Sequence, residues 1–343
     1  MKKIIVTGGS GFIGSNLVQL LLKKKYFVIN IDKSSYSANP YNVKDFKKNK
    51  NYLFFKIDIN KKNKIYKILK KYKPIGIFNL AAETHVDRSI DNAQNFIKTN
   101  ILGVYNLLEA IRKLEKKTKN KLKFLQVSTD EVYGDIPKNK KANEDYNYNP
   151  SSPYSASKAG ADQLVRSYCR TYGIKTLIAN PCNNYGPNQF PEKFIPKMIF
   201  NILNNKSLPV YGKGKNIREW IYVKDNCEAL VKIFLKGKIG KNYNIGTGVR
   251  LKNINIVQRL LEISKKNKIK LTDKTIVKFV TDRPGHDERY ALNSNKIKRE
   301  IGWKNKTSIS RGLSKTINWY LKNLNFFKKI SKRNITKRLG LKV

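Results

Sequence analysis

Short, continuous apolar runs alternate with longer amphipathic stretches over the first half of the chain. Six of these runs have the length of buried strands: KIIVTGG, FVINID, NYLFFKID, IGIFNLAA, LKFLQVS and KTLIAN. A strand that is apolar without interruption is buried on both faces, which is typical of a parallel sheet between two layers of helices. The pattern therefore predicts an α/β fold with a doubly wound parallel sheet.

Two of the stretches between the runs have helical spacing. The first, FIGSNLVQLLLKK, directly follows the first predicted strand. The second is longer, AQNFIKTNILGVYNLLEAIRKLEKK, and we expect it to be one helix with a single apolar stripe. That stripe contains Phe96, Ile97, Ile101, Val104, Leu108 and Ile111.

The alternation of strands and helices stops after about residue 180, where loops rich in Asn, Pro and Gly separate shorter elements. We expect a dinucleotide-binding domain over residues 1–180 and a smaller C-terminal, mainly substrate-binding lobe over residues 181–325. A basic tail follows over residues 326–343. No low-complexity linker separates the two lobes, so the boundary is soft and the chain is expected to cross between them.

The turn after the first predicted strand, TGGSGFIG, contains Gly8, Gly11 and Gly14 in a GxxGxxG pattern. Residues without a Cβ let backbone N–H groups and the N-terminus of the following helix approach a pyrophosphate. Asp32 ends the next strand, at about the spacing of a carboxylate that accepts hydrogen bonds from an adenosine ribose. Together they predict a Rossmann site for NAD rather than NADP, because the acid repels a 2′-phosphate, although Lys33 weakens that preference.

Two acids stand side by side where the fifth apolar run ends. Asp130 and Glu131, in VSTDEVYG, would point to opposite faces of an extended chain. Repulsion raises the pKa of one carboxyl while the other stays ionised, so the pair could supply an acid and a base. For both to reach one ligand, the chain must bend at this strand end. The alternative is a pair at a helix start, where acids favour the dipole, but the VYGDIP that follows lacks a helical pattern.

Tyr154 and Lys158, in PYSASKAGAD, are four residues apart. On a helix this spacing places them on one face, where an ammonium could favour the phenolate form of the tyrosine. A phenol with an ordinary pKa near 10 needs such help to act as a base near neutrality. The motif is specific only in combination with a dinucleotide fold, since YxxxK also occurs by chance in lysine-rich helices.

Composition changes this picture little. Lys and Arg number 71 against 24 Asp and Glu, a formal charge of +47, and the lysines are scattered over nearly every polar segment. We interpret them as a solvated surface, with attraction of anionic metabolites or nucleic acid as alternatives. No nucleic-acid module accompanies the charge. The three cysteines lack the spacing of a metal site, which favours a reducing compartment without disulfides. The opening apolar run is too short for a signal peptide, and no apolar segment is long enough to span a membrane, so we expect a cytoplasmic protein.

With these motifs, the sequence resembles the extended short-chain dehydrogenase/reductase superfamily and, within it, the dTDP-glucose 4,6-dehydratase family. The resemblance covers nearly the whole chain, and its discriminating parts are STDEVYG and DRPGH. Other stretches that carry it are KIIVTGGSGFIGSN, NLAAETHVDRSI, SPYSASKAGAD, NNYGPNQFPEKFIP, LPVYGKGKNIREWIYV, FVTDRPGHDERYAL and IGWKNKTSISRGLSKTINWYL. Epimerases and decarboxylases of the superfamily share the glycine turn and YxxxK but generally lack the adjacent acids.

The resemblance implies the role of each catalytic residue. Tyr154 would take the proton of the glucose 4-hydroxyl, with Thr129 and Lys158 holding the hydroxyl and its base. Glu131 would remove the C5 proton, and a protonated Asp130 would give its proton to the departing 6-hydroxyl. The product would be a 4-keto-6-deoxy sugar for a deoxysugar pathway such as that to rhamnose.

The resemblance also implies the binding residues. For NAD these are Gly8, Gly11, Phe12, Ile13, Gly14, Asp32, Lys33, Ser34, Ser35, Asp58, Ile59, Leu80, Ala81, Ala82, Thr84, Thr99, Tyr154, Lys158 and Asn184. For the nucleotide sugar they are Thr84, Thr129, Asn183, Lys193, Phe194, Pro209, Val210, Tyr211, Arg218, Asn253, Asp282, Arg283, Pro284, Gly285 and His286. Guanidinium groups suit a diphosphate because they present paired donors. No metal is expected.

The chain departs from the family pattern at Pro181 and Cys182, where Cys-Ser is usual, and at Thr84, where Ser is usual. The first change could affect how the substrate is positioned. Two alternatives stay open, namely the same reaction on UDP- or CDP-glucose and a non-catalytic dinucleotide- or RNA-binding protein. The resemblance further implies a homodimer built from two long helices of each subunit.

Overall fold

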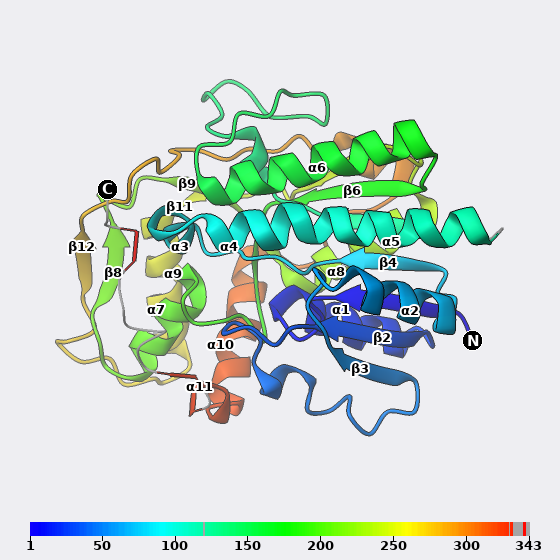
Figure 1. Ribbon diagram of the computed structural model, residues 1–343. Helices are drawn as coiled ribbons and strands as arrows, with labels where there is room; N and C mark the ends of the chain where they lie inside the picture. The colour runs from blue at the N-terminus through cyan, green and yellow to red at the C-terminus, as the bar shows by residue number, and fades with distance from the viewer. Residues whose placement is uncertain (119–120, 329, 332–338, 341–343) are drawn as a thin grey trace.

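The computed structural model describes residues 1–118, 121–328, 330, 331, 339 and 340. A large sheet covered by helices occupies one side of the molecule, and a smaller lobe lies beside it (Figure 1). Most of the predicted basic tail, residues 326–343, lies outside the described residues.

Seven parallel strands form the central sheet, in the order β10-β6-β5-β4-β1-β2-β3. The six strands expected from the apolar runs are confirmed, and β10 joins them from the part of the chain after residue 180. Their bounds are Lys3–Thr7 (β1), Phe27–Asp32 (β2), Tyr52–Lys56 (β3), Gly76–Asn79 (β4), Lys123–Val127 (β5), Thr176–Pro181 (β6) and Asn242–Ile245 (β10).

Helices cover both faces of this sheet, as strands with two apolar faces require. One face packs against α1 (Phe12–Lys23) and α8 (Val223–Lys236). The other packs against α2 (Lys62–Tyr72), α5 (Gly103–Lys117) and α6 (Pro153–Tyr172). The doubly wound arrangement expected from the sequence is therefore confirmed, and α5 and α6 are its two long neighbouring helices (Figure 1).

The order of the strands reverses between β1 and β4. From β1 the sheet grows outward through β2 and β3, and the chain then returns to place β4, β5 and β6 on the other side of β1. Loops that leave the carboxyl ends of strands at such a switch point diverge and open a crevice. The glycine turn after β1 and the two acids after β5 therefore face the same edge of the sheet.

The long helix predicted after β4 is interrupted. It consists of α4 (Gln94–Phe96), a π-helical segment η2 (Ile97–Leu102) and α5. A π-helical segment adds residues to a turn and rotates the apolar face, so the predicted stripe is wrong at Ile97. Ile97 is 51% exposed, whereas Phe96 before it and Val104, Leu108 and Ile111 after it are buried.

The smaller lobe is built around its own apolar cluster. It contains a two-stranded parallel sheet of β8 and β12 and a three-stranded sheet in the order β11-β9-β7. Its strands are Asn183–Tyr185 (β7), Leu208–Tyr211 (β8), Ile217–Tyr222 (β9), Arg250–Lys252 (β11) and Val277–Val280 (β12), and its helices are Phe194–Leu203 (α7), Asn253–Lys266 (α9), Ile309–Lys322 (α10) and Asn325–Lys328 (α11).

In the part of the chain that the structure describes, four further short helices lie in the connections. They are η1 (Pro40–Val43), α3 (Val86–Asp91), η3 (Asp130–Tyr133) and η4 (Ile297–Ile301). Within the described residues, no helix has both the length and the apolar character needed to cross a membrane.

Candidate active site

The glycine turn packs so closely that side chains have no room. A Cβ on Gly14 would lie 2.1 Å from the Gly8 carbonyl oxygen, and Gly8 itself has φ +69° and lies against the backbone of Ala81. Gly11 precedes α1, and no side chain caps the N-terminus of this helix. The backbone N–H groups at the start of α1 are therefore available for an anionic group.

Asp32 lies at the end of β2 beside this turn. Its carboxylate accepts hydrogen bonds from the backbone N–H groups of Ser10, at 3.0 Å, and Ser34, at 2.7 Å. Burial raises the pKa of Asp32, and these two hydrogen bonds oppose the rise. The neighbouring Lys33 donates to Glu83 at 2.8 Å. This ion pair occupies the Lys33 ammonium, the cation that would otherwise favour a 2′-phosphate. The site therefore fits a ribose with a free 2′-hydroxyl.

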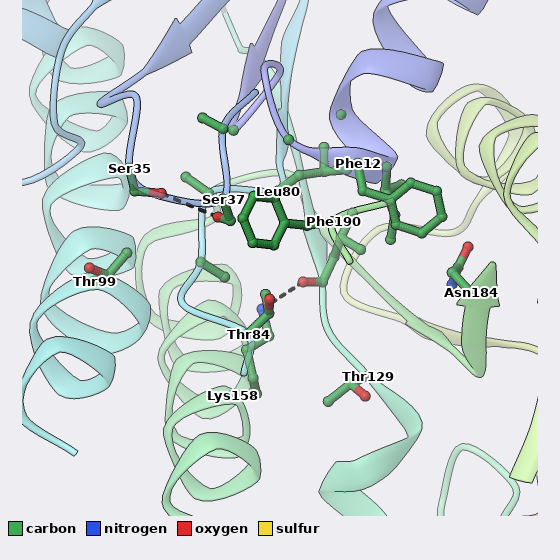
Figure 2. A pocket seen from close by; sticks show the side chains of 18 of the residues that line it. Phe12, Ser35, Ser37, Leu80, Thr84, Thr99, Thr129, Lys158, Asn184 and Phe190 are labelled. Atoms are coloured by element: carbon green, nitrogen blue, oxygen red, sulfur yellow. Dashed lines mark hydrogen bonds between the residues drawn. The ribbon is translucent and has the colours of Figure 1, made fainter. Parts of the chain in front are cut away.

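A cavity runs from the glycine turn to the start of α6. Figure 2 shows Ser35 and Thr99 on one side of it and Asn184 on the other. All the predicted NAD-binding residues except Ser34 line this cavity. Ser34 faces Asp32 through its backbone N–H instead. The lining brings together residues that are far apart in the sequence, from the ends of β2 and β5 and from the loops that follow β1 and β4.

Tyr154 and Lys158 lie one turn apart at the start of α6, which confirms their predicted spacing. Ser152 caps this helix, since its hydroxyl accepts from the N–H of Ser155 and the Ser155 hydroxyl accepts from the N–H of Ser152. The ammonium of Lys158 donates to the carbonyl of Val127 at 2.7 Å. Burial lowers the pKa of Lys158 to about 8.

The predicted effect of Lys158 does not dominate the pKa of Tyr154. Burial, followed by the negative charge of Glu131, raises the pKa of Tyr154 above its usual range, and a hydrogen bond with Thr129 opposes the rise. Burial and the charge of Glu131 thus favour the neutral phenol. Positive charge near the hydroxyl, such as that of Lys158, is therefore needed to make it a base.

The predicted bend at Asp130 and Glu131 is confirmed. Thr129 is extended, with φ −155° and ψ 157°, and its hydroxyl accepts from the N–H of Glu131 as the chain turns into η3. The expectation that the two acids do not start a helix is wrong, because Asp130–Tyr133 form one 3₁₀ turn. This turn brings both carboxyls to the edge of the same cavity.

The two acids have different surroundings. Burial raises the pKa of Asp130 well above its ordinary value, and the charges of Glu131 and Glu219 add to the rise. Burial also raises the pKa of Glu131, but the cations Arg283, Lys193 and Arg218 oppose that rise. Asp130 therefore holds its proton more tightly than Glu131. Its Oδ2 is buried without a hydrogen-bond partner among the described residues.

A second cavity opens in the smaller lobe and shares Glu131, Asn183 and Lys193 with the first. Its lining includes the predicted substrate residues Asn183, Lys193, Phe194, Pro209, Tyr211, Arg218, Asn253, Arg283 and His286. Thr84 and Thr129 line the first cavity instead. Both cavities thus meet beside the two acids.

Four of the predicted substrate residues line neither cavity. Val210 is fully buried in the apolar cluster of the smaller lobe. Asp282 accepts from the backbone N–H of Arg283 and lies 2.6 Å from Nδ1 of His286, so its position orients those two residues. Pro284 and Gly285 form the loop between them.

Several lining residues were missed by the sequence argument. Asp87 accepts from Arg283 at 2.8 Å and from the Tyr211 hydroxyl at 2.7 Å, which fixes both side chains in the second cavity. Glu192 pairs with Arg88 at 3.2 Å. The signal was present, because Asp87 and Glu192 lie in AETHVDRSI and NQFPEKFIP, but nothing local distinguished these acids from surface carboxylates.

Cys182, one of the departures from the family pattern, is buried and lines the first cavity. Burial raises the pKa of its thiol well above the ordinary value, so it is a neutral, apolar group there. Pro181 before it ends β6 and contributes to the same lining. No group of side chains that could hold a metal ion occurs among the described residues.

A doubly wound sheet, a glycine turn with a ribose-side carboxylate, and a tyrosine–lysine pair in one cavity define a dinucleotide-dependent enzyme of the short-chain dehydrogenase/reductase class. A family model described as GDP-mannose 4,6 dehydratase matches residues 5–316. The dTDP-glucose 4,6-dehydratase of Haemophilus influenzae is 45% identical over 335 residues, which cover 94% of this chain and 99% of that protein. The chain therefore belongs to the dTDP-glucose 4,6-dehydratase family.

Solved structures agree with this assignment. A dTDP-glucose 4,6-dehydratase from Bacillus anthracis, crystallised in complex with NAD, is 39% identical with a TM-score of 0.87, over 96% of this chain and 100% of that chain. A UDP-glucose 4-epimerase from Thermotoga maritima has a TM-score of 0.84 at 30% identity, over 94% of this chain and 99% of that chain. The fold is thus shared with epimerases, and the residues of the site decide the reaction.

Proposed function

We propose that the protein is an NAD-dependent enzyme that dehydrates dTDP-glucose to dTDP-4-keto-6-deoxyglucose. The observation that supports this most strongly is the η3 turn, which places Asp130 and Glu131 where the two cavities meet. Relatives named dTDP-glucose 4,6-dehydratase and a related structure in complex with NAD support the same reaction and cofactor. The product belongs to deoxysugar biosynthesis, for which rhamnose formation is an example.

The first cavity has the features that NAD requires. The start of α1 offers backbone N–H groups to a pyrophosphate, and Asp32 offers a carboxylate to the adenosine ribose. When bound, NAD supplies a hydride acceptor for C4 of the sugar and a hydride donor for C6. The chain itself supplies every proton transfer.

Oxidation at C4 requires a base for the 4-hydroxyl. Tyr154 removes this proton as the phenolate, and Thr129, which already bonds the phenol, holds the same hydroxyl in place. Lys158 provides the positive charge that favours the phenolate. The resulting 4-keto group acidifies the neighbouring C5–H bond.

Elimination of water then uses the two acids in opposite protonation states. Glu131, whose charge three cations favour, removes the C5 proton. Asp130, whose proton is held by burial and by the charge of Glu131, gives that proton to the departing 6-hydroxyl. Water leaves, C6 takes up the hydride that C4 gave up, and the return of a proton to C5 completes the keto sugar.

The second cavity supplies the groups for a nucleoside diphosphate. Arg218 and Arg283 present guanidinium groups there, and Lys193 adds a third cation. The comparisons favour dTDP-glucose over UDP- or CDP-glucose and over a non-catalytic dinucleotide- or RNA-binding protein. We infer that nucleic acid and membranes are not partners, and that the protein works in the cytoplasm.

One assay tests the reaction and the nucleotide together. Purified protein is incubated, without added reductant, with dTDP-glucose and separately with UDP- and CDP-glucose, and the alkali-induced absorbance of a 4-keto-6-deoxy sugar is read. Signal with dTDP-glucose alone supports the proposal. Signal only with another nucleotide overturns the substrate, and no signal with any, despite bound NAD, overturns the reaction.

We infer that two copies of the chain form a dimer through α5 and α6. These two long helices pack side by side. Their exposed sides and the adjoining η2 segment carry large apolar residues, namely Ile97, Leu102, Tyr105 and Tyr172. A second copy would remove this surface from water.

A further inference from the structure

Asp162 is a buried acid that the proposed mechanism does not use. It lies one helical turn after Lys158 on α6, and its side chain is fully buried. Its Oδ2 accepts from the hydroxyls of Ser128, at 2.5 Å, and Tyr148, at 3.1 Å. Its Oδ1 has no hydrogen-bond partner among the described residues. Asp162 lines neither of the two cavities, so it does not contact a ligand in either of them.

The hydrogen bonds around Asp162 connect it to the catalytic strand end. Ser128 lies between Val127, whose carbonyl accepts from Lys158, and Thr129. The hydroxyl of Tyr148 also accepts from Asn180, at 3.4 Å, and Asn180 donates to the carbonyl of Thr129 at 3.3 Å. The carboxylate is therefore held at a fixed place behind the residues that contact the sugar.

Several titratable groups face this carboxylate. Lys158 and Arg166 lie on the same helix, Tyr148 precedes α6, and Tyr133 belongs to η3. Arg166 donates to the Tyr148 hydroxyl at 3.3 Å, and its positive charge also acts on Asp162. Tyr154 is also within reach of the charge of Asp162. Among the cations in this set, Lys158 is the buried one with a proposed catalytic role.

We propose that Asp162 is a positioning residue that keeps Lys158 cationic behind Tyr154 during oxidation at C4. The inference rests on the proposed function, because it gives Lys158 the task of favouring the phenolate. Asp162 acts on the ammonium through its field, since the hydrogen bond of Lys158 goes to Val127. A buried ammonium without a counter-charge loses its proton readily.

The signs of the two pKa shifts support this role. Burial lowers the pKa of Lys158 to about 8, and Asp162 is the charge that opposes this shift. Burial raises the pKa of Asp162 to about 6, and Lys158 and the hydroxyls of Ser128 and Tyr148 oppose that shift. Both groups are therefore charged between about pH 6 and pH 8. Removal of Asp162 leaves the desolvation of Lys158 unopposed and moves its deprotonation to lower pH.

The test is the pH profile of kcat for dTDP-glucose dehydration by the NAD-loaded enzyme, with Asp162→Asn beside the unchanged protein. We expect the alkaline limb to move to lower pH by about one unit. KM should change less than twofold, because Asp162 does not line the substrate cavity. Where the Asn variant does not fold, by circular dichroism, Asp162→Ser is measured in its place.

Tyr148→Phe is the matched control. It removes a hydrogen bond to the same carboxylate oxygen but leaves the charge, which is fully present at alkaline pH. The alkaline limb of its kcat profile should therefore lie at the same pH as in the unchanged protein. An alkaline limb that stays in place in the folded Asp162 variants, or moves equally in Tyr148→Phe, overturns the inference. Absence of activity in the unchanged protein would instead overturn the proposed function.

Discussion

At the scale of single residues, the chemistry depends on two adjacent acids that differ in their surroundings. Asp130 faces other carboxylates, whereas Glu131 faces cations from the smaller lobe. Identical side chains in these two environments would still titrate apart, because the neighbouring charges set the order of the two pKa values. The assignment of acid and base therefore comes from the surroundings rather than from the difference between Asp and Glu.

Asp130→Asn tests this assignment. An amide cannot deliver a proton, so we expect elimination of water to slow by about 10²- to 10⁴-fold, the usual contribution of a general acid. Oxidation at C4 should continue, because Tyr154 and Lys158 are unchanged. Rapid-quench analysis of a single turnover distinguishes the 4-keto sugar that still carries its 6-hydroxyl from the dehydrated product.

Asp135→Asn serves as the control, since Asp135 is exposed and accepts only from the backbone N–H of Arg289 among the described residues. Elimination at the full rate in Asp130→Asn would show that another group protonates the leaving hydroxyl.

At the scale of elements, the turn between β1 and α1 depends on a glycine with no spare space. Gly14→Ala would place a methyl group 2.1 Å from the Gly8 carbonyl, so backbone must move. We expect a loss of stability of about 1–3 kcal/mol, as for other overpacked sites, and weaker NAD binding because the turn changes shape. Thermal denaturation and calorimetric titration with NAD measure the two effects.

Gly11→Ala is the comparison for stability. Gly11 has φ −77°, and a Cβ there would approach only the Gly8 carbonyl, at 3.3 Å. Equal stability of the two variants would show that the crowding at Gly14 is relieved without cost.

Local patterns were enough to predict the elements that carry the site. The glycine turn, Asp32 at the end of β2 and the spacing of Tyr154 and Lys158 are each set within a few residues. Asp87 could not be predicted, because its function depends on Arg283, which is 196 residues away in the sequence. The exposure of Ile97 was also missed, since the π-helical segment that turns it outward leaves no mark on the apolar spacing.

At the scale of the whole molecule, charge and apolar surface have separate consequences. The formal +47 leaves most cations without an acid to pair with, so repulsion among them opposes association of two copies at low salt. The exposed apolar residues on η2, α5 and α6 favour association. The proposed dimer should therefore form more readily as ionic strength rises.

Leu102→Asp tests the dimer. Leu102 is 49% exposed in η2, and a carboxylate there would have to lose its water when two copies meet. We expect the variant to be a monomer by light scattering coupled to size-exclusion chromatography. Leu235→Asp is the control, because Leu235 is 51% exposed on α8, on the other side of the sheet. A monomeric unchanged protein, or a Leu102→Asp variant that stays dimeric, would contradict the proposed interface.

The place of β10 has a consequence for how the chain folds during synthesis. This strand pairs in parallel with β6 but is made only after β7, β8, β9 and α8. Until residue 245 has left the ribosome, β6 is an edge strand with unpaired backbone groups, open to pairing with another chain. Parallel pairing across such a separation is also slow. Newly made chains therefore pass through an aggregation-prone interval, and a fragment that ends near residue 180 would remain in it.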